Sequence, residues 1–342
     1  MNRKTLLYLA ITVGLVFVLV ESRAGAAEFY KGKTIRLIVG TSAGGGYDTY
    51  ARVIARNITK HIPGNPSIIV QNMPGAGSII AANYLYNVAK PNGLTMAMLI
   101  SGIIMEQVMG IKEMKLDVSK FKWIGAPTVG VPACAIMGFT GLKTLDDVLK
   151  SKKPIIFGAA GSSTREQPRI LRDFLGANVK VVLGYKGTSS IRAAMQRKEV
   201  DAACWQWVSM KITARDMLDA KGDDKMIPFL LQGESQDPEV RNLPKYTDFI
   251  KDKENLDAFK AWMGQYLFFR PFALPPNTPA DRVNILRTAF KKTLKDPEFL
   301  ALAKKTKLDI RYVSAEKIDK YIKETLATPA AAKSKLRTIV GK

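Results

Sequence analysis

Short apolar runs alternate with stretches of helical periodicity along most of this chain. The alternation is typical of α/β layering, in which helices pack on a largely parallel sheet. The 342 residues exceed what a single core usually holds, so we expect two lobes. The expected strands are Thr34–Val39, Ser67–Gln71, Thr95–Leu99, Ala133–Met137, Ile155–Gly158, Val179–Leu183 and Ile227–Leu231.

Helical spacing of apolar residues predicts the helices between these strands. The first stripe consists of Ala51, Ile54, Ala55 and Ile58. Late in the chain, Thr278 is expected to cap a helix that has Pro279 at its first position. The apolar face of that helix consists of Val283, Leu286, Phe290 and Leu294. A final helix is expected to start near Ser314.

The N-terminal residues have the pattern of a secretory signal peptide. Arg3 and Lys4 precede the apolar run Leu6–Val20, and Ala24-Gly25-Ala26 fits the usual cleavage site. We therefore expect export to the periplasm after removal of residues 1–26, and an uncleaved membrane anchor is the alternative. Removal takes three of the 52 basic and one of the 30 acidic residues, which leaves a formal net charge of +20.

The basic charge has two interpretations. A positive field would attract anionic small molecules, whereas the alternative is a solvated surface with no role in recognition. Lys and Arg are interspersed with Asp and Glu, and the protein is expected to be exported, so we expect no nucleic acid partner.

The chain has few of the side chains that metals and catalysis use. With one histidine, His61, and two cysteines, Cys134 and Cys204, we expect no protein-ligated metal and no cofactor. A disulfide is permitted outside the cytoplasm. The apolar context of both cysteines favours two buried free thiols, and a bridge is the alternative.

Four Gly/Ser-rich loops each connect an expected strand to a helical pattern. Glycine lets a ligand approach the backbone, and the first amides of a helix are unpaired donors at its positive end. Such a place suits a carboxylate or phosphate, and in open α/β sheets ligands bind at these ends. We expect a ligand site here, although each loop alone is explained by a tight turn. The loops span residues 41–48, 73–78, 158–164 and 185–189.

One loop also matches a hydrolase motif. Residues 40–44 spell G-x-S-x-G with Ser42 as the nucleophile, between a strand and a helix. The only histidine, His61, lies at the far end of the helix that this loop begins, roughly 20 Å away at 1.5 Å per residue. The triad cannot close, so a secreted serine hydrolase is the weaker alternative.

Further residues in these loops have a structural and a functional interpretation. Asp48 is either a first-turn acid or a group that orients a ligand. Ser163 and Glu166 are expected to form a capping box, with Arg165 either facing a ligand carboxylate or solvated. Trp205 is either a core residue or a wall against which a ligand stacks.

Several motifs together resemble the Bug family, the extracytoplasmic solute receptors of tripartite tricarboxylate transporters. They are Ile35-Arg36-Leu37-Ile38-Val39, Gly44-Gly45-x-x-Asp48 with Arg52, Gln71-Asn72-Met73-Pro74-Gly75-Ala76-Gly77, Asn92-Gly93-Leu94-Thr95 and Gly184-Tyr185-Lys186-Gly187. The resemblance implies a type II periplasmic-binding-protein fold, with two α/β lobes joined by crossover strands and a ligand cleft between them. It also implies a receptor that binds a small organic acid and delivers it to membrane transporter subunits. We further expect a monomer and, given the scarcity of catalytic side chains, no enzymatic activity. A ligand-sensing subunit with no transport role is a further alternative.

The chain departs from the family pattern at Gly40 and Gly184, where proline is usual, and at Ser78, where glycine is usual. The loop Gly161-Ser162-Ser163-Thr164 departs as well. On the family layout, residues 27–132 and 263–342 form lobe 1 and residues 133–262 form lobe 2. The expected ligand-binding residues are Ser42, Ala43, Gly44, Gly45, Asp48, Pro74, Gly75, Ala76, Gly77, Ser78, Gly161, Ser162, Ser163, Thr164, Tyr185, Lys186, Gly187 and Trp205.

Overall fold

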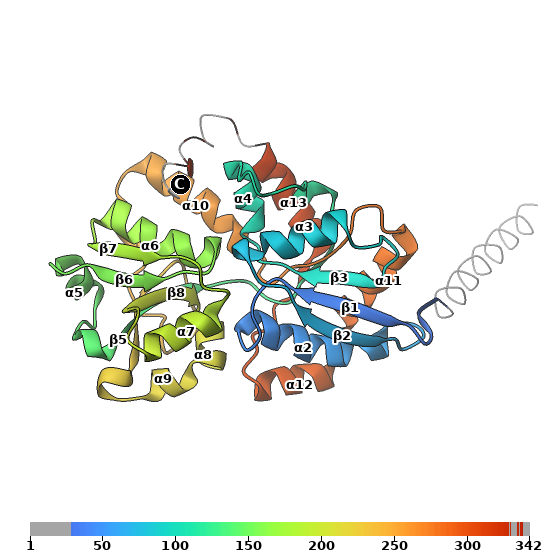
Figure 1. Ribbon diagram of the computed structural model, residues 1–342, viewed down its shortest axis with the longest axis horizontal. Coiled ribbons are helices and arrows are strands. Elements are labelled where there is room, and N and C mark those ends of the chain that lie inside the picture. The colour runs from blue at the N-terminus through green and yellow to red at the C-terminus, as the bar shows by residue number, and fades with distance from the viewer. Residues whose placement is uncertain (1–28, 328, 330–333, 335, 338–342) are drawn as a thin grey trace, which may run out of the picture.

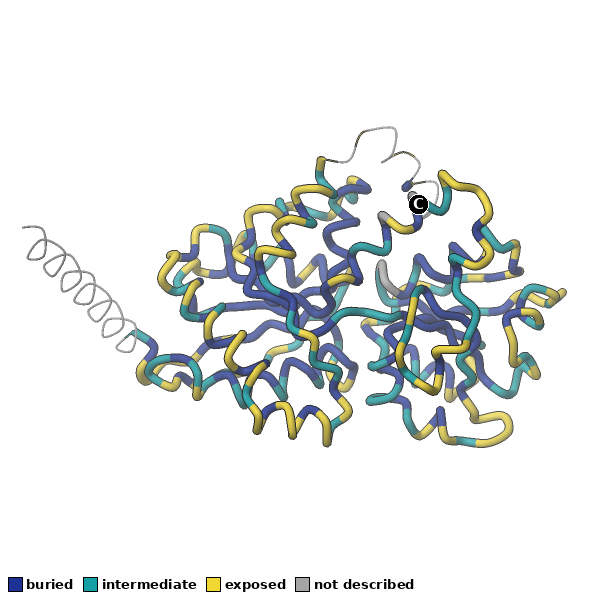
Figure 2. Tube along the Cα trace, turned by 180° about the vertical axis from the view of Figure 1, so that it is seen from behind, coloured by how far each residue is buried: buried dark blue, intermediate teal, exposed yellow. Residues whose placement is uncertain are grey.

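The structure is a computed structural model that describes residues 29–327, 329, 334, 336 and 337. At Ser162, Ser163, Asp257 and Ala261 it describes the backbone alone. The expected signal segment, residues 1–26, lies outside the described residues. Two lobes lie side by side, each with a central sheet covered by helices (Figure 1). Buried stretches run through the middle of both lobes (Figure 2), so each lobe has its own core.

Lobe 1 is built on a six-stranded mixed sheet. Strands β1, β2 and β3 are parallel, whereas β10 runs antiparallel to β3 and β4, and β11 runs antiparallel to β4. In spatial order the strands are β11 (Val313–Ser314), β4 (Lys122–Ala126), β10 (Phe272–Leu274), β3 (Thr95–Met98), β1 (Thr34–Val39) and β2 (Ser67–Asn72). Its helices are α2 (Gly46–Ile58), α3 (Ile79–Asn87), α4 (Ile103–Met109), α11 (Ala280–Thr293), α12 (Pro297–Lys305) and α13 (Ala315–Leu326).

Lobe 2 is built on a five-stranded mixed sheet. Strand β6 is parallel to β7 and β8, and β5 is antiparallel to β8 and β9. In spatial order the strands are β7 (Val179–Val182), β6 (Ile155–Gly158), β8 (Ala202–Gln206), β5 (Pro132–Met137) and β9 (Met226–Leu231). Its helices are α5 (Leu145–Lys150), α6 (Ser162–Leu175), α7 (Thr188–Gln196), α8 (Trp207–Thr213), α9 (Arg215–Asp219) and α10 (Lys253–Met263).

Two chain segments connect the lobes and lie against one another. Thr128 and Phe269 form an isolated antiparallel bridge, in which the Phe269 amide donates to the Thr128 carbonyl at 2.7 Å. The Gly130 amide donates to the Tyr266 carbonyl at 2.8 Å. Lobe 1 therefore contains strands from before and after lobe 2 in the sequence. No helix within the described residues is long and apolar enough to cross a membrane.

The expectation of α/β layering is confirmed, and the seven expected strands are present to within one residue at each end. Four further strands of the described structure are not among the seven, namely β4, β10 and β11 in lobe 1 and β8 in lobe 2. The face of α11 formed by Val283, Leu286, Phe290 and Leu294 is buried as expected.

The expected cap of α11 is wrong. Pro279 is the N-cap of α11, and Thr278 turns its hydroxyl back to donate to the Pro275 carbonyl at 2.8 Å.

The expectation of free thiols is also wrong. Cys134 and Cys204 form a disulfide that closes a separation of 70 residues. The reason lies in the register of β5 and β8, which places Cys134 directly opposite Cys204 with Cα atoms 4.0 Å apart. Both residues are fully buried in lobe 2.

Candidate functional site

Three helices of the two lobes begin at one small cavity, and each has glycine as its N-cap. The caps are Gly45 of α2, Gly161 of α6 and Gly187 of α7, and all three line the cavity. Glycine has no side-chain oxygen with which to accept the first amides of its helix. The donors at the start of these helices are therefore free to bind a ligand, and the helix dipoles favour an anion.

The cavity has a volume of about 40 Å³ and contacts both lobes. That volume holds a few water molecules or one small polar group. The described residues that line it contain no acid, and Lys186 is their one cation. They are Gly40, Thr41, Ser42, Gly45, Gly46, Tyr47, Gly75, Gly77, Ser78, Ile100, Ala160, Gly161, Thr164, Lys186, Gly187 and Thr188.

A second cavity of about 360 Å³ lies directly outside the first one. The two share Gly75, Gly77, Ala160, Gly161 and Lys186 as lining residues. A volume of several hundred cubic ångströms is typical of small-molecule sites. The two cavities together form a cleft with a small inner chamber and a larger outer chamber.

The lobes are closed on one another around the inner chamber. The hydroxyls of Ser42 and Ser189 are 2.9 Å apart, and Ser189 also donates to the Ala43 carbonyl at 3.0 Å. A Cβ built on Gly187 would overlap the Ser42 hydroxyl. These contacts connect the first loop of lobe 1 to the start of α7 in lobe 2, so a ligand larger than the inner chamber requires the lobes to move apart.

Asp48 shapes the first loop from behind the cavity. Its buried carboxylate accepts from the Gly44 amide, from Arg52 and from the Asn72 side-chain amide, each at 3.0 Å. Burial alone would raise the pKa of Asp48, but these hydrogen bonds hold that pKa below its usual value. The carboxylate is therefore charged and fully engaged at neutral pH.

A charged cluster crosses the lobe boundary beside the outer chamber. Arg165 of α6 lies 3.0 Å from Glu106 of α4 and 3.3 Å from Glu166, and both carboxylates are almost fully buried. Trp262 of α10 donates to the second oxygen of Glu166 at 2.9 Å. Burial and the neighbouring Glu106 raise the pKa of Glu166 to about 8. The cluster joins the two lobes, with Arg165 paired to a carboxylate of each lobe.

Gly40 and Ser78, two departures from the family pattern, lie against one another. Ser78 adopts a positive φ of 79° and donates from its hydroxyl to the Gly40 carbonyl at 3.0 Å. A Cβ built on Gly40 would overlap that hydroxyl. A residue with a side chain at position 40 is therefore incompatible with the serine at position 78, and the two departures belong together.

Comparison with known proteins agrees with this architecture. The chain is 26% identical over 328 residues to a UPF0065 protein of Agrobacterium vitis, covering 93% of this chain and 84% of that protein. Its structure resembles the periplasmic binding protein BugD with a TM-score of 0.72 and 18% identity, covering 91% of this chain and 98% of BugD. The chain therefore has the fold of the periplasmic binding protein BugD.

A second solved structure, MatC, has the same fold. MatC from Rhodopseudomonas palustris with bound malate has a TM-score of 0.69 and 19% identity, covering 90% of this chain and 99% of MatC. No protein-family model matches the chain.

Many of the expected ligand-binding residues of this Bug-type fold line the cleft. Those on the inner chamber are Ser42, Gly45, Gly75, Gly77, Ser78, Gly161, Thr164, Lys186 and Gly187. Ala76 and Tyr185 line the outer chamber. The side chains of Ser162 and Ser163 lie outside the described part of the chain.

The other expected residues lie away from the lining of either chamber. Ala43 and Gly44 face Ser189 across the lobe boundary, and Pro74 precedes the lining residue Gly75 in the second loop. Trp205 packs in the core of lobe 2 with 3% of its surface exposed, which is the structural alternative that the sequence left open.

The expected capping box of Ser163 and Glu166 is wrong. The N-cap of α6 is Gly161, and the Thr164 hydroxyl accepts from the Ala160 and Gly161 amides at 2.8 and 3.1 Å. Glu166 lies inside the helix and uses its carboxylate for Arg165 and Trp262. The Glu166 carboxylate thus accepts from Trp262 of α10 instead of from the first amides of its own helix.

Four residues that line the inner chamber were not among the expected ligand-binding residues, although they lie in the Gly/Ser-rich loops: Thr41, Gly46, Tyr47 and Thr188. Glu106 was missed because its partner Arg165 is 59 residues away. The other four residues could have been predicted from the sequence, because they lie in the same loops as the glycines at the helix starts.

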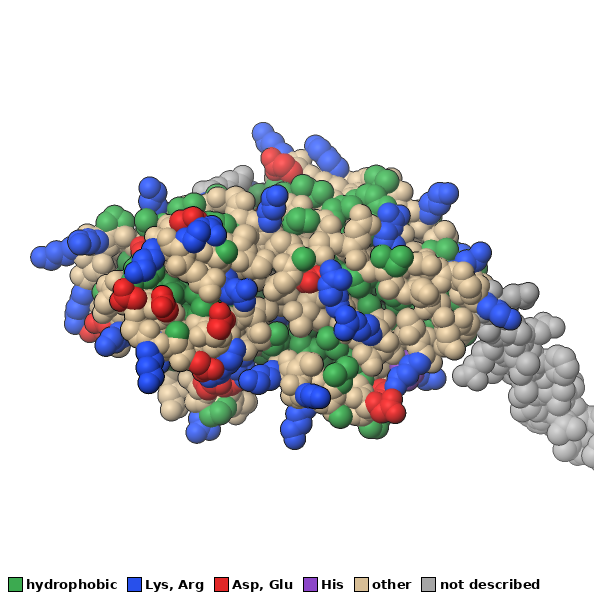
Figure 3. Space-filling view, turned by 60° about the horizontal axis from the view of Figure 1, so that its bottom comes forward, with side chains coloured by type: hydrophobic (Ala, Val, Ile, Leu, Met, Phe, Trp, Pro, Cys, Tyr) green, Lys and Arg blue, Asp and Glu red, His purple; other side chains and the backbone are tan. Residues whose placement is uncertain are grey.

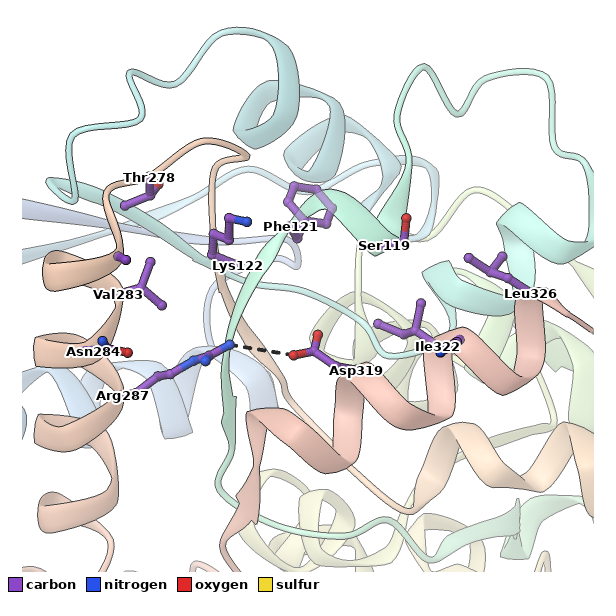
Figure 4. Close-up of a pocket in the computed structure, with 12 residues that line it drawn as sticks. Ser119, Phe121, Lys122, Thr278, Val283, Asn284, Arg287, Asp319, Ile322 and Leu326 are labelled. Carbon is purple, nitrogen blue, oxygen red and sulfur yellow. Dashed lines mark ion pairs between the residues drawn. The ribbon is translucent and has the colours of Figure 1, made fainter.

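A larger groove lies elsewhere on lobe 1, between α11 and α13. It has a volume of about 670 Å³, and its lining residues come from lobe 1 alone. Figure 4 shows Arg287 and Asp319 directed at one another across it, with nitrogen and oxygen 3.7 Å apart. Movement of the two lobes relative to one another would leave this groove unchanged, so the cleft between the lobes is the candidate ligand site.

The described residues around Ser42 include no histidine that could act as its catalytic base. The Ser42 hydroxyl is hydrogen bonded to Ser189. His61 lies in the 3-10 turn Thr59–His61 beyond the end of α2, where its Nε2 is 2.9 Å from Asp296. The histidine and the serine are thus at opposite ends of the helix.

Proposed function

We propose that this protein is a periplasmic receptor that closes its two lobes on a small organic acid and presents it to the membrane subunits of a tripartite tricarboxylate-type transporter. The observation that carries the proposal is the convergence of three glycine-capped helix starts on one cavity. Such donors suit a carboxylate, the group that gives an organic acid its charge.

The electrostatics of the inner chamber support an anionic ligand. The described lining residues include no carboxylate that would repel one. A buried carboxylate needs several charge-assisted hydrogen bonds to offset its desolvation. The first amides of α2, α6 and α7, with hydroxyls such as Thr188, supply donors from both lobes at once.

Binding from both lobes gives the receptor its mechanism. An acid that contacts α2 in lobe 1 and α7 in lobe 2 stabilises the closed form more than the open form. The contacts between Ser42 and Ser189 and between Arg165 and Glu106 belong to the closed form. Ligand binding and lobe closure are therefore coupled, and a transporter can distinguish the loaded receptor by its shape.

The neighbours in structure agree with this class of ligand, since MatC is described with bound malate. BugD is described as a periplasmic binding protein. The proposal includes export directed by residues 1–26 and a monomeric receptor. Many basic side chains are spread over the face shown in Figure 3. Their positive field raises the rate at which the receptor encounters anions.

A thermal-shift screen tests the proposal. The panel contains acetate, malate, adipate, citrate and benzoate, with acetamide, adipamide and benzamide as neutral counterparts. An acid at 100 times its dissociation constant stabilises the fold by about 2.7 kcal/mol, so the melting midpoint should rise for at least one acid and not for its amide. Ser42→Asp, which places a negative charge in the inner chamber, should abolish the shift, whereas Ser42→Ala should retain most of it. Equal shifts for acids and amides, or none for any acid, would contradict the proposal.

A further inference from the structure

Arg270 is a fully buried cation with no carboxylate partner in the described structure. Its side chain is 0% exposed, and its Nε has no hydrogen-bond partner. Among the described residues, the guanidinium has one hydrogen bond, from Nη2 to the hydroxyl of Ser209 in lobe 2. A charge buried in this way costs folding free energy unless another group compensates it.

Aromatic rings hold the guanidinium in place without neutralising it. Its central carbon lies 3.9 Å from the ring centre of Tyr50, 4.7 Å from that of Phe269 and 5.4 Å from that of Tyr47. Asp309 also acts on Arg270 electrostatically. That carboxylate, however, is paired with Arg311 at 2.6 Å, so it does not provide an ion pair for Arg270.

The guanidinium lies directly behind the ligand cavity. A Cβ built on Gly46 would lie 2.8 Å from Arg270 Nη2, and Gly46 lines the inner chamber. Tyr47, the next residue of α2, also lines that chamber and stacks near the guanidinium. The backbone of the first turn of α2 therefore separates the cation from the chamber.

The backbone of Arg270 is strained as well. Its φ is +63°, a left-handed conformation that is unfavourable for a residue with a side chain. Such strain is retained where the surrounding structure imposes a conformation, and it gathers at functional sites. Arg270 is thus buried, has no ionic partner among the described residues, has a strained backbone and lies next to the ligand cavity.

We propose that Arg270 is the buried cation of the ligand site, whose charge acts across the first turn of α2 to select a carboxylate in the inner chamber. The proposal rests on the proposed function and adds to it the residue that sets the preference for charge. Arg270 does not line the chamber, so it is a positioning residue for the anion. The ligand in turn supplies the negative charge that Arg270 lacks.

Calorimetric titration of the acid and amide pairs acetate and acetamide, adipate and adipamide, and benzoate and benzamide tests this role. Arg270→Met should weaken binding of the acid at least tenfold and leave any binding of its amide unchanged. Arg270→Lys, which keeps the charge, should retain most of the affinity. Arg282→Met is the matched control, because Arg282 also stacks on a ring, that of Phe29 at 3.6 Å, and is not among the residues that line the cleft.

A second variant keeps the test decisive if Arg270→Met does not fold. Ser209→Asp places a carboxylate beside Arg270 and neutralises it from within the protein. We expect Ser209→Asp to fold with a ligand-free melting midpoint equal to or above that of the wild type, and to bind the acid at least tenfold more weakly.

The outcomes separate this proposal from the proposed function. If the wild type binds an acid and both Arg270→Met and Ser209→Asp bind it equally well, the role of Arg270 is wrong and the receptor function stands. Equal loss for acid and amide would mean that Arg270 is only structural. If the wild type binds none of the acids, the receptor function and the role of Arg270 are both wrong.

Discussion

A Cβ built on Gly161 would lie 2.6 Å from the Cα of Gly77. Gly161 is the N-cap of α6 in lobe 2, and Gly77 lies in the 3-10 turn Ala76–Ser78 of lobe 1. The closed form therefore brings two glycine backbones from opposite lobes into direct contact between the inner and outer chambers.

Gly161→Ala should weaken ligand binding by about tenfold or more, because the methyl group meets backbone of the opposite lobe and holds the closed form apart. Calorimetric titration with the acid that gives the largest thermal shift measures the effect. Gly233→Ala is a matched control, since its methyl group would meet only the flexible end of Met263. Wild-type affinity in Gly161→Ala would mean that this contact is not part of the ligand-bound form.

The Arg165 cluster predicts a pH dependence of stability. Burial and Glu106 raise the pKa of Glu166 from 4.5 to about 8. Between these values the folded state holds a proton that the unfolded state has released, so the free energy of unfolding should fall as pH rises from about 5 to 8.

Glu166→Gln, which resembles the protonated acid, should therefore flatten the dependence of the melting midpoint on pH over this interval. Glu113→Gln provides the control, because Glu113 lines the same outer chamber but is exposed. A midpoint of Glu166→Gln that follows the wild type from pH 5 to 8 would show that Glu166 does not hold the proton.

The disulfide should contribute strongly to the stability of lobe 2. Closing a loop of 70 residues is worth about 4 kcal/mol in the chain-entropy model. We expect the double substitution Cys134→Ala, Cys204→Ala to lower the unfolding free energy by about this amount in a urea titration, with ligand affinity unchanged, because both residues lie in the core. Full stability of the variant would argue that the bridge adds little beyond the sheet.

Gly40 and Ser78 should be energetically coupled. Gly40→Ala alone should destabilise the protein by about 1–3 kcal/mol, because the new methyl group overlaps the Ser78 hydroxyl. In the double variant Gly40→Ala, Ser78→Gly the overlap is absent, so most of that loss should be recovered. A urea-unfolding double-mutant cycle measures the coupling, and simple additivity would contradict it.

Much of the fold was predictable because its signals are local. A run such as Thr34–Val39 shows its apolar pattern within six residues, and the glycines at positions 45, 161 and 187 stand in the loops that follow such runs. Strand β11, by contrast, has only two residues, Val313 and Ser314. Its place in the sheet depends on pairing with β4, which the sequence near it does not encode.

The features that the sequence did not reveal depend on contacts between distant residues. Pairing of Cys134 with Cys204 follows from the register of β5 and β8, which no spacing reveals. Arg270 meets Gly46 only because the strands after lobe 2 return to the sheet of lobe 1. An arginine before a proline carries no pattern of its own, so only the fold identifies it.

The central claim is that the starts of α2, α6 and α7 bind the carboxylate, and amide NMR of the labelled protein tests it most directly. On titration with the acid selected by thermal shift, the amide signals of Gly46, Ser162 and Thr188, the first residues of the three helices, should shift together with one dissociation constant. The signals of Lys122 and Arg287 in the separate groove of lobe 1 should stay in place. Shifts in that groove with unchanged signals at the three helix starts would contradict the account.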